Sequence, residues 1–369
     1  MKVGFDAKRA FHNTSGLGNY SRNTLNALQK YCPEINLCLF TPKSSDLYTN
    51  TEKAELIQPA YKTKMMQAYW RTNSIVKDIR KSGIEIYHGL SNELPSNIKK
   101  TNIPAIVSIH DLIFVRHPEL YSLIDREIYL RKTKQACKNS DKIIAVSEQT
   151  KSDIVEFYEI EPSKIEVIYQ NCNPRFLNKC SKEEKEKTLL KYSLPKDYIL
   201  FVGSIEERKN ALNIVKALKQ YNIDLPLVLI GKHTAYADII RKYVNENKLN
   251  NQVFILHNIP DLDLPSLYQS ALVFVYPSIF EGFGIPVLEA ISSEIPVITS
   301  NTSSLPEAAG KDNILINPKD IDALANAIMN LANSEELRKD IAEKSLQYAE
   351  KFKPENMALQ LKNLYQSLL

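Results

Sequence analysis

Two glutamates flank a glycine pair in the carboxyl-terminal third of the chain. The stretch 278–300 reads SIFEGFGIPVLEAISSEIPVITS, with Glu281 before Gly282 and Gly284, and Glu289 inside the apolar segment that follows. Glycine lets a backbone approach a ligand closely, and a helix that starts there attracts anions such as a diphosphate. On one straight helix the two acids would lie about 80° apart. Either they are a helix cap and a solvated acid, or both converge on one polyhydroxylated ligand.

Two adjacent cations follow another apolar run. Arg208 and Lys209 come after Tyr198–Val202 and begin the next predicted helix. Fixed cations at such a position suit a group that departs with negative charge. The alternative is a pair of solvated charges at a helix start.

The amino-terminal half carries its own candidates. His110 ends the apolar run Ala105–His110 and is followed by Asp111, while Gly16 and Gly18 open the helix after the first strand. A strand-end histidine can be a core residue or a ligand contact. The glycine amides could meet phosphates. The third glycine of the dinucleotide fingerprint is missing, which disfavours NAD.

The elements that must position these residues alternate between strand and helix. The predicted strands are Lys2–Asp6, Ile35–Phe40, Ile84–His88, Ala105–His110 and Lys142–Val146, then Tyr198–Val202, Leu227–Ile230, Val253–Leu256, Leu272–Tyr276 and Pro296–Thr299. This alternation predicts two doubly wound α/β domains, 1–174 and 175–352, and a last helix in 353–369 that could cross back to the first domain. Such sheets bind ligands beyond the carboxyl ends of their strands, so we expect the domains to face each other across a cleft.

Composition limits the class of protein. The chain has 369 residues, 44% apolar and 24% charged. No apolar run approaches the roughly 20 residues of a membrane-spanning helix, and the N-terminus has no signal-peptide core, so we expect the chain to fold in the cytosol. Five cysteines without ligand spacing predict reduced thiols. Residues 1–180 carry a net charge of +7 and residues 181–369 one of −3. A basic half suits acidic lipid or nucleic acid, but no nucleic-acid-binding signature is present.

One basic segment has two interpretations. Lys62–Lys81 contains Met65, Tyr69, Val76 and Ile79 at helical spacing, with six basic residues interleaved. The favoured interpretation is a helix whose apolar side packs on the sheet. The other is a peripheral helix on anionic lipid.

Five motifs in this order resemble the retaining, nucleotide-sugar-dependent glycosyltransferases of family 4, which have the GT-B fold of two Rossmann-like domains. They are SGLGNY (Ser15–Tyr20), SIHDL (Ser108–Leu112), IIAVSEQTKSDI (Ile143–Ile154), VGSIEERKN (Val202–Asn210) and EGFGIPVLEA (281–290). The resemblance covers nearly the whole chain.

The resemblance implies a role for each candidate residue. Arg208 and Lys209 would bind the leaving diphosphate, Glu289 the ribose and Glu281 the donor sugar. His110 would contact the hexose near the reacting carbon. Asp111 would orient its neighbours or the acceptor. The further donor-binding residues expected are Gly16, Gly18, Ser204, Gly282, Phe283 and Gly284, with Ser204 standing where some relatives carry arginine.

Neither a cofactor nor a metal is expected. The resemblance implies that no protein nucleophile is needed, because the leaving phosphate can take the acceptor's proton. In agreement with this, the sequence contains no nucleophile elbow. Asp261-Leu262-Asp263 looks like a metal-binding Asp-x-Asp motif, but it precedes the predicted helix Leu264–Gln269 and is better interpreted as an N-cap.

The expected function is transfer of a hexose, first of all mannose from GDP-mannose, to a hydroxyl of a lipid-linked glycan. The second domain would hold the nucleotide and the first the acceptor, on the inner face of the membrane. A nucleotide-sugar epimerase and an inactive sugar-nucleotide-binding partner are the alternatives. The base, the sugar, the acceptor and the oligomeric state stay open.

Overall fold

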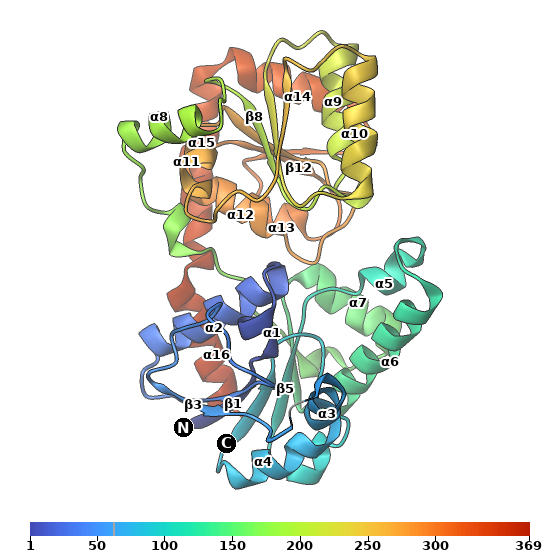
Figure 1. Cartoon of the computed structure of the whole chain (residues 1–369), viewed down its shortest axis with the longest axis vertical. Coiled ribbons are helices and arrows are strands. Elements are labelled where there is room, and N and C mark those ends of the chain that lie inside the picture. Colours follow the sequence, from blue (N-terminus) through green and yellow to red (C-terminus); the bar gives the residue numbers. More distant parts are fainter. Residues whose placement is uncertain (62) are drawn as a thin grey trace. The chain divides into compact units, whose positions relative to one another are not determined.

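The computed structural model describes residues 1–61 and 63–369, which form two compact units (Figure 1). Unit 1 comprises Met1–Asn171 and Phe352–Leu369, and unit 2 comprises Cys172–Lys351. Each unit has one parallel sheet flanked by helices. The predicted doubly wound α/β class is therefore confirmed.

The sheet of unit 1 has seven strands in the order β3-β2-β1-β4-β5-β6-β7. The strands are β1 (Lys2–Asp6), β2 (Asn36–Phe40), β3 (Ala54–Ile57), β4 (Ile86–Gly89), β5 (Ala105–Ile109), β6 (Lys142–Ala145) and β7 (Ile165–Val167). The helices are α1 (Lys8–His12), α2 (Gly16–Tyr31), α3 (Lys64–Tyr69), α4 (Ile75–Lys81), α5 (Ile113–Arg116), α6 (Leu123–Asn139), α7 (Glu148–Tyr158) and α16 (Pro354–Gln366). The edge strands β3 and β7 were not predicted, because each is short and only partly buried.

The sheet of unit 2 has six strands in the order β10-β9-β8-β11-β12-β13. The strands are β8 (Ile199–Val202), β9 (Leu227–Ile230), β10 (Val253–Leu256), β11 (Val273–Tyr276), β12 (Val297–Ser300) and β13 (Ile314–Ile316). The helices are α8 (Lys182–Lys191), α9 (Ala211–Gln220), α10 (Ala235–Glu246), α11 (Leu264–Gln269), α12 (Ile285–Ser292), α13 (Leu305–Ala309), α14 (Ile321–Asn333) and α15 (Glu335–Ala349).

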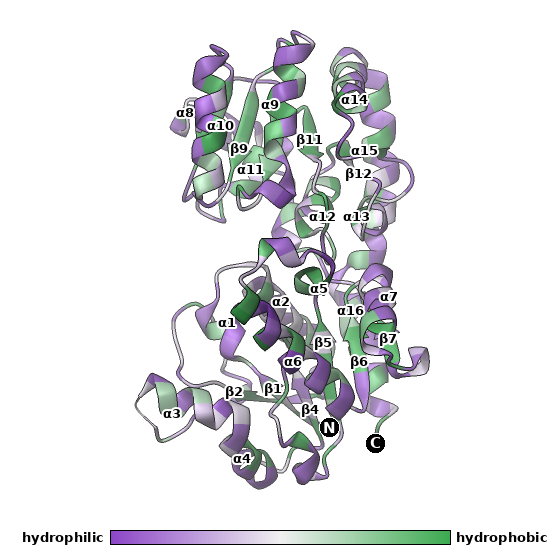
Figure 2. Cartoon of the chain, turned by 90° about the vertical axis from the view of Figure 1, so that its right-hand side faces the viewer, coloured by the Kyte–Doolittle hydropathy of each residue, from purple (hydrophilic) through white to green (hydrophobic). Residues whose placement is uncertain are grey.

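Strand order reverses once in each unit. The switch lies between β1 and β4 in unit 1 and between β8 and β11 in unit 2. At such a point the loops after neighbouring strands leave to opposite faces and open a crevice at the carboxyl ends. Central strands are buried on both faces because helices cover both sides of each sheet, and Figure 2 colours strands such as β9 and β11 green.

The carboxyl-terminal helix α16 belongs to unit 1. It begins at Pro354, whose missing N–H costs nothing in a first helical turn. Its apolar side packs against α2, and Lys362 pairs with Glu34 at 2.5 Å. Tyr365 is fully buried, and its hydroxyl lies 2.8 Å from Nδ1 of His88 on β4.

The basic segment that begins at Lys62 is continuously helical over residues 64–81, but the favoured interpretation, a helix whose apolar side packs on the sheet, holds only for its second half. Lys62 itself lies outside the described residues. The remainder forms α3, a π-helical turn over Trp70–Ser74 and α4. Val76 and Ile79 on α4 are buried as expected, whereas Met65 and Tyr69 on α3 are exposed.

A buried ion cluster holds the π-helical turn. Arg71, at this turn, donates from Nε and Nη2 to Oδ2 of Asp6 at 2.9 and 2.6 Å, and from Nη1 to Glu93 at 2.6 Å. Trp70 is also buried and donates from Nε1 to Asp78 at 2.6 Å. The cluster therefore anchors this turn inside unit 1, while α3, which precedes it, contributes no buried residue.

All five cysteines are free thiols, four of them buried and Cys180 half-buried. Within residues 1–61 and 63–369, no helix combines the length and apolar character that crossing a bilayer requires.

The Arg71 cluster generates a stability prediction. Arg71→Met leaves the buried Asp6 carboxylate without its cation and Glu93 with only Lys132, 3.7 Å away, and we expect the free energy of unfolding to fall by about 3–5 kcal/mol. Urea denaturation measures this change. The matched control is Arg131→Met, because Arg131 pairs with Glu127 at 2.5 Å on the exposed face of α6; that loss should stay below about 1 kcal/mol. Equal losses in the two variants would contradict the prediction.

Candidate functional site

An ion pair joins the loops that follow β8 and β11. Arg208 Nη1 lies 2.8 Å from Glu281 Oε1, and each side chain is only 14% exposed. The same guanidinium donates to the carbonyl of Phe280. These two strands are neighbours at the switch point, so both loops border the same crevice at the carboxyl ends of the strands. The structure therefore brings Arg208 and Glu281 together, 73 residues apart in sequence.

The conformation of Asn210 fixes the positions of Arg208 and Lys209. Glu207–Lys209 form a 3₁₀ turn, and Asn210 adopts a left-handed conformation with φ 59° before α9 begins. Its side-chain amide donates to the carbonyls of Pro277 and Pro318, at 3.2 and 2.7 Å. The prediction that the cations begin the helix is wrong by one turn, because this cap holds them in the preceding loop.

Glu281 is held as a charged acceptor. The hydroxyls of Tyr276 and Ser278 donate to its Oε1 at 2.9 and 3.0 Å. Burial by itself would raise the pKa of this carboxyl. The positive charges of Arg208 and Lys209 and the two hydroxyl donors outweigh burial, so the pKa of Glu281 lies below its ordinary value.

Glu289 has the opposite electrostatics. It lies in the second turn of α12, and the hydroxyl of Tyr268 donates to its Oε2 at 2.9 Å. Burial raises the pKa of this carboxyl to about 7, although the Tyr268 hydrogen bond and the charges of Arg175 and Lys209 act against the rise. At neutral pH the side chain is therefore shared between its protonated and ionised forms.

Lys209 acts on both acids. Its charge favours the ionised forms of Glu281 and Glu289, so it lies within electrostatic reach of each. Its Nζ stands 5.6 Å from the centre of the Tyr276 ring. A Cβ added to Gly203 would come within 3.1 Å of that Nζ. Ser204 follows in the same loop, where its carbonyl accepts from the amide of Glu206 at 2.9 Å.

The glycine pair shapes the start of α12. Gly284 has φ +123°, which side chains rarely tolerate, and the helix begins directly after it. Ser304 donates to the carbonyls of Glu281 and Phe283 at 2.9 and 2.8 Å. The ring of Phe283 is buried, so a ligand would meet the backbone of Gly282 and Phe283 rather than the ring.

In unit 1, His110 is buried directly after β5. Its Nε2 lies 2.9 Å from the carbonyl of Leu90, which can only accept, so Nε2 carries the proton and Nδ1 is an acceptor. Burial lowers the pKa of His110 to about 4, so the ring is neutral at physiological pH. The ring of Tyr20 meets it edge-on at 4.5 Å.

The predicted glycines open α2, one turn before Tyr20. A Cβ on Gly16 would meet no atom within 4 Å. The N–H of Gly18 already donates to the carbonyl of Ser15 and to Oδ1 of Asn13, at 2.9 and 3.1 Å. A Cβ on Gly18 would lie 1.8 Å from the Asn13 carbonyl oxygen. Local packing thus explains Gly18, whose amide already has two acceptors within unit 1; the expected contact of the glycine amides with a donor phosphate stays a prediction.

Asp111 accepts from the amide of Ile113 at 3.1 Å, as an orienting residue would. It and the other unit 1 candidates lie around His110, whereas the cations and the two glutamates lie in unit 2. The convergence of both groups on one ligand stays a prediction.

Tyrosine and serine hydroxyls that hold the site were missed. Tyr276 and Tyr268 are buried, and their hydroxyls donate to Glu281 and Glu289 respectively. In unit 1, Ser108 Oγ lies 2.9 Å from the Tyr20 hydroxyl and 2.8 Å from Nε2 of His88. The available signal for Tyr276 was a polar tip at the last position of an apolar strand.

The interpretation of Asp261-Leu262-Asp263 as an N-cap is also wrong in detail. Asp263 occupies the cap position of α11 but makes no side-chain cap. It pairs instead with Lys191 at 2.6 Å and accepts from Tyr192, while Asp261 lies 3.6 Å from Arg175. Apart from the one residue left undescribed, the chain has no group of three or more His, Cys, Asp or Glu that could hold a metal ion.

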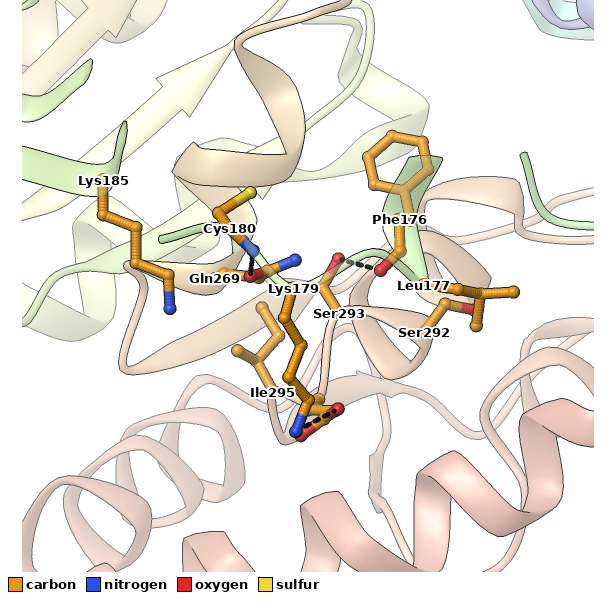
Figure 3. Close-up of a pocket in the computed structure, with 10 residues that line it drawn as sticks. Phe176, Leu177, Lys179, Cys180, Lys185, Gln269, Ser292, Ser293 and Ile295 are labelled. Carbon is orange, nitrogen blue, oxygen red and sulfur yellow. Dashed lines mark hydrogen bonds and ion pairs between the residues drawn. The ribbon is translucent and has the colours of Figure 1, made fainter. Parts of the chain in front are cut away.

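Two pockets of unit 2 lie near α8, α11 and α12. One of about 250 Å³ runs between the start of α8 and the end of α12, where the amide of Cys180 donates to Gln269 at 2.9 Å (Figure 3). One of about 450 Å³ lies between Arg175, α8 and the start of α11. None of the predicted site residues lines either pocket.

Comparison with known families matches both halves of the chain. Residues 14–173 match the family described as Glycosyltransferase Family 4, and residues 181–348 match Glycosyl transferases group 1. The O-antigen chain mannosyltransferase B of Escherichia coli is 32% identical over 289 residues, which cover 77% of this chain and 74% of that protein. The O-antigen chain mannosyltransferase RfbU of Salmonella typhimurium is 30% identical over 225 residues, which cover 61% of this chain and 60% of that protein.

Solved structures share the fold. Sucrose-phosphate synthase from Thermosynechococcus elongatus superposes with a TM-score of 0.79 at 21% identity, over 100% of this chain and 99% of that one. Anabaena HepE in complex with UDP and glucose gives 0.79 at 16% identity, over 99% of each chain. The expected GT-B fold is confirmed.

The two carboxyls generate a pH prediction. The folded chain keeps the Glu289 proton up to about pH 7, whereas the unfolded chain loses it near 4.5. The folded state binds more protons in this window, so this group makes the free energy of unfolding fall as pH rises from 4.5 to 7. Glu289→Gln should remove that slope in urea denaturation.

Glu281→Gln is the matched control, because its shift has the opposite sign. Because the folded chain lowers the pKa of Glu281, this group stabilises the fold at pH values above its ordinary pKa, and that stabilisation is lost as the pH falls. This variant should cost stability at neutral pH and little in acid. Identical pH profiles for the two variants would contradict the assignment.

Proposed function

The chain belongs to the family 4 glycosyltransferases, with a group 1 carboxyl-terminal half, and from this premise we propose retaining transfer of a hexose. The donor would be a nucleoside-diphosphate sugar and the acceptor a hydroxyl of a glycan. Unit 2 would hold the donor and unit 1 the acceptor. The single observation that carries the proposal is the Arg208–Glu281 pair beside Lys209 at the β8/β11 switch point.

The charges of unit 2 suit such a donor. Arg208 and Lys209 stand in one loop, where they can bind the two phosphates and stabilise the negative charge that develops on the leaving group. Glu281 is ionised and can accept two sugar hydroxyls at once. Ribose hydroxyls that donate to Glu289 would favour its ionised form and draw its pKa below 7.

His110 suits contact with an uncharged sugar. Its Nδ1 accepts a hydrogen bond while Leu90 fixes the ring, so a hexose hydroxyl can donate to it. A neutral imidazole here adds no positive charge next to the reacting carbon. Asp111 would hold the turn after it.

The proposed step uses no protein nucleophile and no metal. The bond between the anomeric carbon and the diphosphate oxygen breaks, and the acceptor oxygen bonds to the same face of that carbon. The acceptor's proton passes to the departing phosphate oxygen. The cations of the chain would neutralise the leaving group, a role that divalent metals fill elsewhere.

Mannose from GDP-mannose is the first donor to test. The relatives at 32% and 30% identity are named as mannosyltransferases of O-antigen chains, which supports mannose and a cell-surface glycan. We extend the proposal to a lipid-linked acceptor and to work on the cytoplasmic face of the membrane.

Donor binding should raise thermal stability and depend on Lys209. GDP at about a hundred times its dissociation constant would add about 2.7 kcal/mol, and a thermal-shift screen of GDP, UDP and ADP identifies the base. Lys209→Ala should weaken the shift and lower kcat by roughly a hundredfold, because a leaving-group cation is lost. Lys219→Ala on the exposed side of α9 is the control. Unchanged kinetics in Lys209→Ala would remove this residue from the site.

The stereochemistry and the metal requirement form a second test. Product formed from GDP-mannose should have the α configuration of its donor by NMR, and a chelator should leave the rate unchanged. An inverted product would contradict the retaining step, and a strict divalent-ion requirement the metal-free one. Without acceptor, slow release of nucleoside diphosphate supports a transferase. An altered sugar would indicate the epimerase, and tight binding without turnover the inactive partner.

A further inference from the structure

The short helix α3 displays apolar side chains that the rest of unit 1 does not use. It contributes no buried residue over Lys64–Tyr69. Met65 is 78% exposed, Tyr69 53%, Tyr61 39% and Met66 37%. Four side chains of about 200 Å² each leave on the order of 400 Å² of surface at these exposures. A patch of this size on a soluble unit marks an interaction site.

The chain holds this helix out instead of folding it inward. Six residues do not form a stable helix alone. The hydroxyl of Thr63 accepts from the amide of Met66 at 3.4 Å, and the side chain of Gln67 donates to the Tyr61 carbonyl at 3.1 Å. At its carboxyl end α3 continues into the anchored π-helical turn. Figure 2 shows α3 at the outer edge of unit 1.

Charge identifies the kind of partner. Residues 56–77 contain no aspartate or glutamate and carry four basic residues. Arg71 is neutralised by its buried partners, whereas Lys64 and Lys77 are exposed and form no ion pair with any described residue. Methionine adapts to irregular apolar surroundings, and tyrosine favours the boundary between hydrocarbon and water. An acid-free surface with these side chains complements an anionic lipid bilayer.

We propose that α3 with Tyr61 is a membrane-docking element, whose methionines and tyrosines enter the headgroup region of an anionic bilayer while Lys64 contacts phosphates. The inference deepens the proposed lipid-linked acceptor and rests on it for its biological sense. A second copy of the chain fits less well, because an interface between proteins needs roughly 800 Å² per partner.

A competing surface lies at the start of α6. Leu123, Ile124, Ile128 and Tyr129 are exposed there. The acids Asp125 and Glu127 are offset by Arg126 and Arg131, the latter paired with Glu127. Because these charges cancel, we expect this surface to gain less from acidic lipid than the acid-free segment does.

Flotation with vesicles tests the proposal on the full chain. Vesicles of phosphatidylcholine with phosphatidylglycerol should bind the protein, and phosphatidylcholine alone should bind it weakly. Met65→Ser with Tyr69→Ser should lower the partition coefficient roughly tenfold, because apolar area no longer enters the bilayer. Lys64→Glu should weaken binding at low salt only. Leu190→Ser, at an equally exposed leucine of α8 in unit 2, is the matched control.

Three results would overturn the inference: binding unchanged in the α3 variant, binding lost only in Leu123→Ser with Ile124→Ser, or dimerisation that the α3 substitutions abolish. The α3 variant removes no buried side chain, so its melting temperature and its GDP-induced thermal shift should equal those of the parent chain. A parent chain that binds GDP but not vesicles would refute the docking element alone. A parent chain that binds none of GDP, UDP and ADP would refute the proposed function separately.

Discussion

The ion pair between Arg208 and Glu281 is the constraint on which the candidate site of unit 2 depends. It joins the loops after β8 and β11, which a backbone bond from the Ile279 amide to the Arg208 carbonyl at 2.8 Å also holds together. Breaking such a shielded pair leaves an uncompensated charge, so the loops stay closed together. Asn210, Ser278 and Ser304 then fix the backbone around it, and Lys209 is left facing both acids.

The two glutamates show how surroundings separate identical side chains. Cations and hydroxyl donors keep Glu281 ionised, while Glu289 lies on an apolar helix with one tyrosine donor and is shared between its protonated and ionised forms at neutral pH. Each is paired with a buried tyrosine from a neighbouring element, Tyr276 from β11 and Tyr268 from α11. A ligand whose hydroxyls donate to Glu289 would therefore add hydrogen bonds to this carboxyl without displacing the donors of Glu281.

Unit 1 is built on neutral buried polar groups instead. His88 and His110 are both held uncharged by burial. The Leu90 carbonyl assigns the ring proton of His110 to Nε2, whereas His88 lies between the hydroxyls of Tyr365 and Ser108, which can each donate or accept. A charged cluster around Arg71 is the exception, with side chains of Arg71 and Asp6 less than 10% exposed. It anchors the π-helical turn together with the buried Trp70, while the methionines of the preceding α3 remain exposed.

The sequence by itself determined the alternation of strands and helices, and with it the α/β class, because apolar periodicity and turn residues are local properties. It also identified Arg208, Lys209, Glu281, Glu289 and His110 by residue type and by their places after strands. It could not determine that Arg208 pairs with Glu281, that Gly18 serves local packing, or that Asp263 pairs with Lys191. Those outcomes depend on which distant groups compete for a side chain. Only the tertiary structure sets the distances and burial that decide such competition.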